Sequence, residues 1–196
     1  MTAPRPIAVF DFDGTLVKGD SLWPFLSAVA GWPRCVAALA MAVVRQAMER
    51  PQGRDARTFI KAHLLQSILG GRRVDDLAPA VEKMRGWPKW NEAILEKLKE
   101  HHDAGNHVVI ASGSLDIYLT ALLEKVPYDA LICTRMEIED SVVTGEMISG
   151  NCVRRRKAEL VADYLITHGP FGESWGYGNA PHDLPMMNLL QHRVVV

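Results

Sequence analysis

The hydrophobic positions of this 196-residue chain follow two different patterns in its N-terminal half. Residues 7–10 are consecutive apolar residues that end in polar ones, which predicts a short strand buried on both faces. Residues 21–85 follow a helical pattern rich in Ala, Leu and Met, with helix breakers at 31–33, 51–53 and 70–71. The breakers predict three or four helices and no strand in this stretch.

From residue 90 onwards, strand and helix patterns alternate. We expect strands at 107–111, 130–133, 174–177 and 193–196, and helices at 90–102, 115–125, 156–167 and 184–190. Residues 136–147 alternate apolar and polar positions around Asp140-Ser141, which predicts a β-hairpin.

This order of elements predicts an α/β protein. Alternating strands and helices form a Rossmann-like parallel sheet with helices on both faces. The helical stretch then becomes an all-helical cap inserted after the first strand. We assign residues 1–17 and 87–196 to the core and residues 18–86 to the cap.

Composition narrows the class of protein. The chain has 22 Lys and Arg against 23 Asp and Glu, so it lacks the positive surplus of a nucleic-acid-binding protein. Its 48% hydrophobic and 23% charged residues are typical of a globular chain. The cysteines Cys35, Cys133 and Cys152 form no CxxC pair, and residues 1–6 do not resemble a signal peptide. We therefore expect a cytoplasmic protein.

Residues 22–44 are rich in apolar side chains and contain a single charged residue, Arg34. Pro33 and Arg34 divide the stretch, which predicts two short apolar helices instead of one straight membrane span. We favour packing of these helices on one another and on the core. Peripheral contact of the cap with a membrane is the alternative, because the stretch holds more apolar area than a small cap needs.

Polar side chains follow several of the predicted strands at their carboxyl ends, where ligands bind in open α/β sheets. Two carboxylates two residues apart at the end of a buried strand are costly to bury unless a cation lies nearby. For such a pair alone, a turn cap and a solvated side chain would be the simpler interpretation. The candidates are Asp11, Asp13, Ser112, Gly113, Asn179 and Asp183, with Lys157 in a predicted helix.

The motif Asp11-Phe12-Asp13-Gly14-Thr15-Leu16 resembles the first motif of the haloacid dehalogenase (HAD) superfamily of phosphohydrolases. Residues 110–113, Lys157 and residues 178–183 resemble the second, third and fourth motifs, in the family's order. A helical insert directly after the first motif is similar to the phosphoserine-phosphatase-like branch, subfamily IB. The resemblance implies the HAD fold and a phosphatase that acts on a small phosphorylated metabolite.

The same resemblance implies the catalytic roles. Asp11 would attack phosphorus and form an aspartyl-phosphate intermediate, since carboxylates serve as covalent nucleophiles in phosphoryl transfer. Asp13 would protonate the leaving alcohol and later deprotonate the attacking water. The branch that cleaves carbon–halogen bonds lacks the second Asp, so Asp13 favours phosphate ester hydrolysis.

The resemblance also implies a Mg²⁺ site. Its ligands would be the Asp11 carboxylate, the Asp13 backbone carbonyl and Asn179, with Asp183 reaching the ion through water. The family usually has Asp where this chain has Asn179, so we expect weaker Mg²⁺ binding without loss of activity.

Ser112, the Gly113 N–H and Lys157 would hold the phosphoryl oxygens. The alternatives are a helix N-cap for Ser112 and a solvated basic face for Lys157, which follows three arginines. Asp20 stands where related phosphatases often contact substrate. An equally good interpretation is that Asp20 caps the helix predicted to start at Ser21.

Three other functions stay open at this point. The apolar stretch and a resemblance to phosphatases of lipid head groups allow a lipid-phosphate substrate at a membrane surface. Asn179 alone favours a non-catalytic binding protein with the same fold, against which the other motif residues weigh. A phosphotransferase, in which an alcohol other than water accepts the phosphoryl group, is not excluded.

Overall fold

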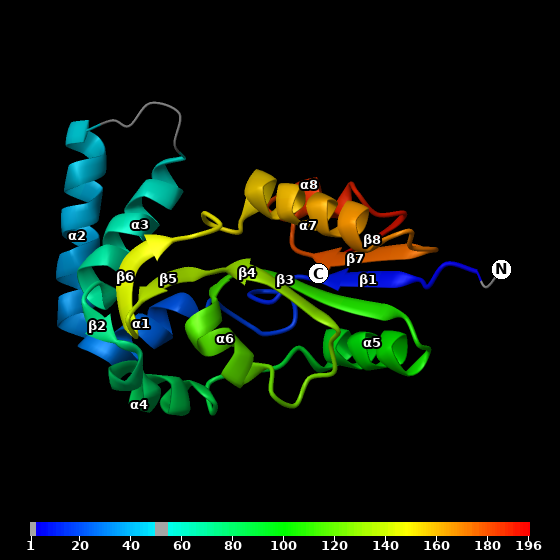
Figure 1. The fold of residues 1–196 in the computed structure, drawn as a ribbon, viewed down its shortest axis with the longest axis horizontal. Helices are drawn as coiled ribbons and strands as arrows, with labels where there is room; N and C mark the ends of the chain where they lie inside the picture. The colour runs from blue at the N-terminus through cyan, green and yellow to red at the C-terminus, as the bar shows by residue number, and fades with distance from the viewer. Residues whose placement is uncertain (1–2, 50–54) are drawn as a thin grey trace.

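A five-stranded parallel sheet forms the core of the computed structural model, which describes residues 3–49 and 55–196 (Figure 1). The strand order is β4-β3-β1-β7-β8. The strands are β1 (Ile7–Phe10), β3 (His107–Leu115), β4 (Ala130–Thr134), β7 (Ser174–Gly178) and β8 (His192–Val195). The predicted parallel α/β fold is therefore confirmed, and β3 extends to Leu115, where the sequence predicted a helix to begin.

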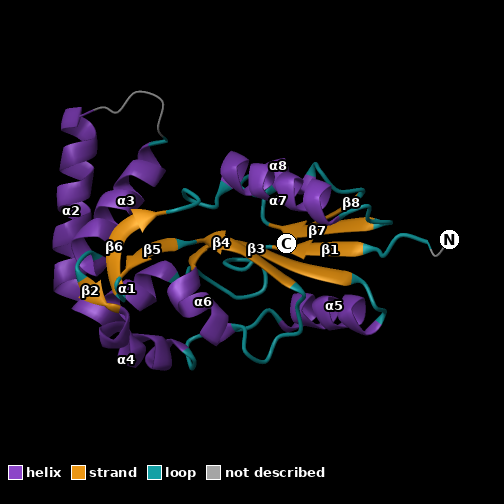
Figure 2. Cartoon of the chain, viewed as in Figure 1, coloured by secondary structure: helices purple, strands orange, loops and turns teal. Residues whose placement is uncertain are grey.

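Helices cover both faces of this sheet (Figure 2). One face carries α5 (Glu92–Asp103) and α6 (Asp116–Leu122), and the other carries α7 (Arg154–His168) and α8 (Leu184–Met187). Consecutive residues of β1 point to opposite faces, so Ala8 and Phe10 join one apolar cluster while Ile7 and Val9 join the other. Burial on both faces explains the unbroken apolar run of this strand.

The described part of the insert after β1 contains four helices: α1 (Leu22–Ala30), α2 (Trp32–Glu49), α3 (Ala56–Leu69) and α4 (Val74–Met84). It also contains a strand, β2 (Arg72–Arg73), which corrects the prediction of no strand between 21 and 85. Two residues are too few to show an alternating pattern, and these two are arginines. The predicted break at 51–53 lies outside the described residues.

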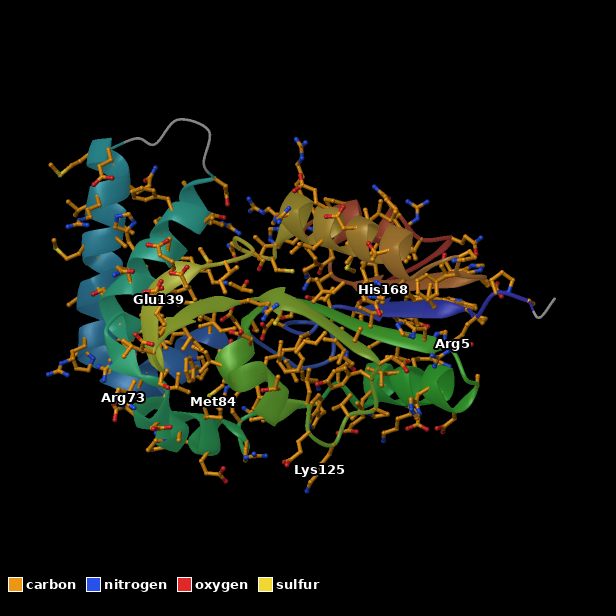
Figure 3. All side chains as sticks on the ribbon, viewed as in Figure 1. Arg5, Arg73, Met84, Lys125, Glu139 and His168 are labelled. Atoms are coloured by element: carbon orange, nitrogen blue, oxygen red, sulfur yellow. The ribbon has the colours of Figure 1, made fainter. Side chains whose placement is uncertain are left out.

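The short strand β2 joins a second sheet of three strands in the order β2-β6-β5. The other two strands, β5 (Met136–Glu139) and β6 (Val142–Met147), are the predicted hairpin, whose turn residues Asp140 and Ser141 both have positive φ. Figure 3 shows Arg73 and Glu139 on the side of the molecule that carries the insert, and Arg5 far from it at the opposite end of the core sheet. The hairpin therefore connects the core to the insert.

The chain enters and leaves the insert at adjacent points. The Lys18 N–H donates to the Lys89 carbonyl at 2.8 Å, and the Asn91 N–H donates to the Leu16 carbonyl at 2.9 Å. This pairing lies close to the predicted boundaries at residues 18 and 86, which stay a prediction.

Helices α1 and α2 meet at a bend of 116°. Gly31 lies at the bend with a φ of 80°, in the left-handed region that glycine adopts without strain. In the described ranges, no single helix is long and apolar enough to cross a membrane, although α1 and α2 together have the required length and composition.

Phe10 should be essential for the stability of the core. Its ring is fully buried and stacks on Tyr177 with centroids 4.3 Å apart. We expect Phe10→Ala to lower the free energy of unfolding by about 3–5 kcal/mol, because it leaves a cavity at the centre of the sheet. Chemical denaturation measures this, with Ile166→Ala as the control, since Ile166 is 81% exposed. Equal losses for the two variants would contradict the prediction.

Candidate active site

A cavity of about 280 Å³ lies between the carboxyl ends of the core strands and the insert. Its wall includes all of the predicted site residues except Ser112. The core provides Asp11, Asp13, Gly113, Lys157, Asn179 and Asp183, and the segment from the first motif through α3 provides Asp20, Arg57 and Lys61.

Lys157 lies at the centre of a buried charge cluster in this wall. Its Nζ is 2.6 Å from Asp11 Oδ1 and 2.6 Å from Asp183 Oδ1. Burial lowers the pKa of Lys157, but the two carboxylates raise it further, so the net direction is upward and the side chain stays protonated. The solvated basic face considered for Lys157 is therefore wrong, because the side chain is buried.

Asp11 directly follows β1 and is held from two sides. The Thr15 hydroxyl donates to Asp11 Oδ2 at 2.9 Å, while Lys157 holds the other oxygen. Burial raises the pKa of Asp11, and Lys157 lowers it by less, so the net direction is upward. Both carboxylate oxygens thus have partners, which fixes the orientation of the group.

The Asp13 carboxylate accepts one hydrogen bond from a backbone N–H and one from a hydroxyl group. Its Oδ1 accepts from the Ser21 N–H at 2.8 Å, and its Oδ2 accepts from the Ser114 hydroxyl. The Ser21 hydroxyl lies 2.7 Å from that of Ser114 and 2.9 Å from that of Tyr118, so the network continues into the core. Burial raises the pKa of Asp13 to about 6.

Asn179 connects the loop after β7 to the first motif. Its Nδ2 donates to the Asp13 carbonyl at 3.2 Å, and its N–H donates to Asp183 Oδ2 at 3.1 Å. Both motifs have a glycine at these contacts. A Cβ on Gly14 would lie 2.9 Å from Asn179 Nδ2, and a Cβ on Gly178 would lie 2.6 Å from Asp183 Cβ. The fourth motif is thereby packed tightly against the first.

These residues form an oxygen-rich set of donors. In residues 3–49 and 55–196, no group of three or more His, Cys, Asp and Glu side chains could hold a metal ion. A site here would therefore also need the Asp13 carbonyl and the Asn179 amide oxygen; the Asn179 Nδ2 donates to that carbonyl at 3.2 Å, which places the two groups side by side. Two carboxylates, a carbonyl and an amide suit Mg²⁺, which takes oxygen ligands and keeps bound water.

The two predicted phosphate-binding residues of β3 differ in position. Gly113 lies on the cavity wall, whereas Ser112 is fully buried and accepts the Ser114 N–H at 3.0 Å. The N-cap considered for Ser112 is wrong, because α6 begins at Asp116 and Leu115 precedes it. The Ser112 hydroxyl instead stabilises the turn of backbone that carries Gly113.

Asp20 lies at the start of α1 and on the wall of the cavity. Its Oδ1 accepts the Leu22 N–H at 3.0 Å at the start of α1, as a helix cap does, and the residue also lies on the cavity wall. Contact with a substrate stays a prediction.

Lys61 is a half-buried cation that the sequence pattern did not single out. It lies on α3, and its Nζ donates to the Gly113 carbonyl at 2.6 Å and to Asn151 Oδ1 at 2.8 Å. Asn151 in turn donates to the Thr58 hydroxyl, one helical turn before Lys61, at 3.2 Å. Burial lowers the pKa of Lys61 to about 8. Its partners are 52 and 90 residues away, so no local spacing could have revealed it.

The comparisons with known proteins agree with the motifs. The family model for haloacid dehalogenase-like hydrolase matches residues 8–188. Phosphoserine phosphatase SerB2 of Mycobacterium tuberculosis is 26% identical over 184 residues, which cover 93% of this chain and 42% of that protein. The chain thus spans less than half the length of this relative.

Solved structures share the fold. A structure from Bordetella pertussis Tohama I has a TM-score of 0.77 at 22% identity, covering 98% of this chain and 90% of that one. A phospho-aspartyl intermediate analogue of phosphoserine phosphatase has a TM-score of 0.63 at 18% identity, covering 99% and 87%.

Lys61→Met should loosen the contact between α3 and the loop at Gly113. The variant keeps the length of the side chain but removes both donors, so we expect the free energy of unfolding to fall by about 1–3 kcal/mol. Denaturant titration measures the change. Lys125→Met is the matched control, because Lys125 is an exposed lysine. If the two variants lost equal stability, the buried contacts would have no net effect.

Proposed function

The chain belongs to the haloacid dehalogenase-like hydrolase family, and from that premise we propose that it is a Mg²⁺-dependent phosphatase of small phosphorylated metabolites. The observation that carries the proposal is the position of Lys157 between Asp11 and Asp183, on the wall that also holds Asp13. The similarity to SerB2 makes phosphoserine the first substrate to test.

Asp11 is the proposed nucleophile. One of its carboxylate oxygens forms a bond to phosphorus while the bond between phosphorus and the alcohol oxygen breaks, which leaves an aspartyl phosphate. The contacts with Thr15 and Lys157 support this role, because they hold the carboxylate in one orientation before substrate binds. Water then attacks the same phosphorus, releases phosphate and restores the carboxylate.

Asp13 is the proposed acid and base. Its pKa of about 6, raised by burial, suits a group that both donates and accepts a proton near neutral pH. It gives its proton to the departing alcohol and takes one from the water that attacks the intermediate. The hydroxyl of Ser114 and the N–H of Ser21 keep the carboxylate in place during both steps.

Lys157 and the Gly113 N–H are the proposed partners of the phosphoryl oxygens. The charge of Lys157 opposes the negative charge that gathers on those oxygens during transfer. When bound, Mg²⁺ would neutralise further phosphoryl charge, and Asp11, the Asp13 carbonyl, Asn179 and Asp183 would hold it.

Asp11→Asn should abolish hydrolysis of phosphoserine and p-nitrophenyl phosphate. The amide keeps the shape of the side chain but is a poor nucleophile, so we expect kcat to fall by roughly 10⁴-fold. Phosphate release in the presence of Mg²⁺ measures the effect, with the exposed Asp163→Asn as control. Activity that survives in Asp11→Asn would reject the mechanism, and an inactive wild type on a broad ester panel would favour the non-catalytic alternative.

Asn179→Asp should tighten Mg²⁺ binding. The variant adds a negative charge to the donor set, and the charge of the ligands is one determinant of divalent-cation affinity. We expect the dissociation constant for Mg²⁺ to fall roughly tenfold in isothermal titration calorimetry. The control is Asn188→Asp, which adds the same charge at an exposed residue directly after α8. Unchanged affinity in Asn179→Asp would show that Asn179 does not contact the ion.

A further inference from the structure

Helix α2 exposes most of its large apolar side chains, whereas a helix that only packs on the core buries them. The residues that it buries against the protein are small: Cys35, Ala38 and Ala42. Leu39 packs against the main apolar cluster, but the other large apolar side chains of α2 are exposed to solvent. We call them the α2 outer face, which consists of Trp32, Val36, Met41, Val43, Val44 and Met48. Their exposed fractions run from 38% to 78%, so much of the apolar area of this helix stays in water.

The outer face is continuous. At about 100° per residue, its members cover roughly half of the helix circumference, and the positions between them are Pro33 and three alanines. Figures 1 and 3 show α2 at the outer edge of the insert, with side chains that project away from the rest of the molecule. Contiguous exposed apolar surfaces of this kind mark interaction sites.

Positive charge lies along one border of this face. Arg34 and Arg45 are 11 residues apart (45 − 34), which is three helical turns, so they lie on the same side of α2. Each lines a shallow hollow between α2 and α3 beside Met41, and Arg72 joins Arg34 in one of them. The residues that line the two hollows include no Asp or Glu.

We propose that the α2 outer face docks on a membrane that contains anionic lipids. The apolar side chains would enter the boundary between head groups and acyl chains, with α2 parallel to the surface. Arg34, Arg45 and Arg72 would then lie at the depth of the lipid phosphates, and Trp32 at the end of the helix suits the same interface.

The charge pattern favours this occupant over a second copy of the chain. A second copy of the same face would bring Arg34, Arg45 and Arg72 against a single acidic residue of α2, Glu49, so positive charge would stay unpaired. An anionic bilayer supplies both an apolar layer and negative phosphates. The proposal goes beyond the phosphatase function and does not depend on it.

Vesicle sedimentation of the full-length chain tests the proposal. Vesicles of phosphatidylcholine are compared with vesicles of phosphatidylcholine and phosphatidylglycerol. We expect binding to the anionic vesicles, and Val44→Glu should weaken it by roughly tenfold or more, because a carboxylate enters the apolar layer. The matched control is Ile166→Glu, which places the same charge at an exposed apolar position of α7 and should bind as the wild type does.

The arginines give a second measurement. Arg34→Gln and Arg45→Gln should each weaken binding to anionic vesicles about fivefold, with little change on phosphatidylcholine alone. All variants should keep their thermal stability and hydrolyse p-nitrophenyl phosphate as the wild type does, which separates this test from the proposed function.

Three results would overturn the proposal. One is the absence of vesicle binding, and another is equal binding by Val44→Glu and Ile166→Glu. The third is a wild-type protein that binds no vesicles and is a dimer in light scattering, while Val44→Glu is a monomer. That result would assign the face to a second copy of the chain.

Discussion

The buried ion cluster of Lys157 with Asp11 and Asp183 is the interaction on which the rest of the site depends. Two carboxylates 2.6 Å from one ammonium group, all nearly inaccessible to water, are tolerable only with close geometry on every side. Several features of the fold serve that geometry. The central strand β1 delivers Asp11, the first turn of α7 delivers Lys157, and Gly178 lets Asp183 approach the end of β7.

Charge in the cluster does not balance, and this agrees with its proposed chemistry. One lysine faces two carboxylates, and Asp13 adds a third acid whose pKa burial raises. A site with surplus negative charge repels a phosphate unless a cation joins it. The same surplus suits a divalent cation, so in the proposed mechanism the acids would favour the metal and Lys157 would favour the phosphate.

Much of this could be predicted from the sequence, because the decisive signals are local. A strand that ends in Asp11 and Asp13 is visible in a few residues, and parallel topology brings the ends of β1, β3 and β7 together. Interactions between distant segments were not visible. Lys61 is one lysine in a helical stretch, and only the docking of α3 on the loop at Gly113 makes it part of the cavity wall. The motif of Ser112 predicted contact with a phosphoryl oxygen, but the structure shows its side chain buried, with its hydroxyl accepting the Ser114 N–H.

The apolar stretch from 22 to 44 shows why composition alone could not decide its role. In α1 the pattern works as expected of a cap, since Phe25 and Leu26 are buried in the main apolar cluster. In α2, beyond the bend at Gly31, most of the large apolar side chains are exposed instead. Toward the protein, α2 buries Cys35, Ala38 and Ala42 and packs Leu39 against the main apolar cluster, while its other large apolar residues stay exposed. Packing within the cap therefore accounts for α1, and the contact surface proposed above concerns α2 alone.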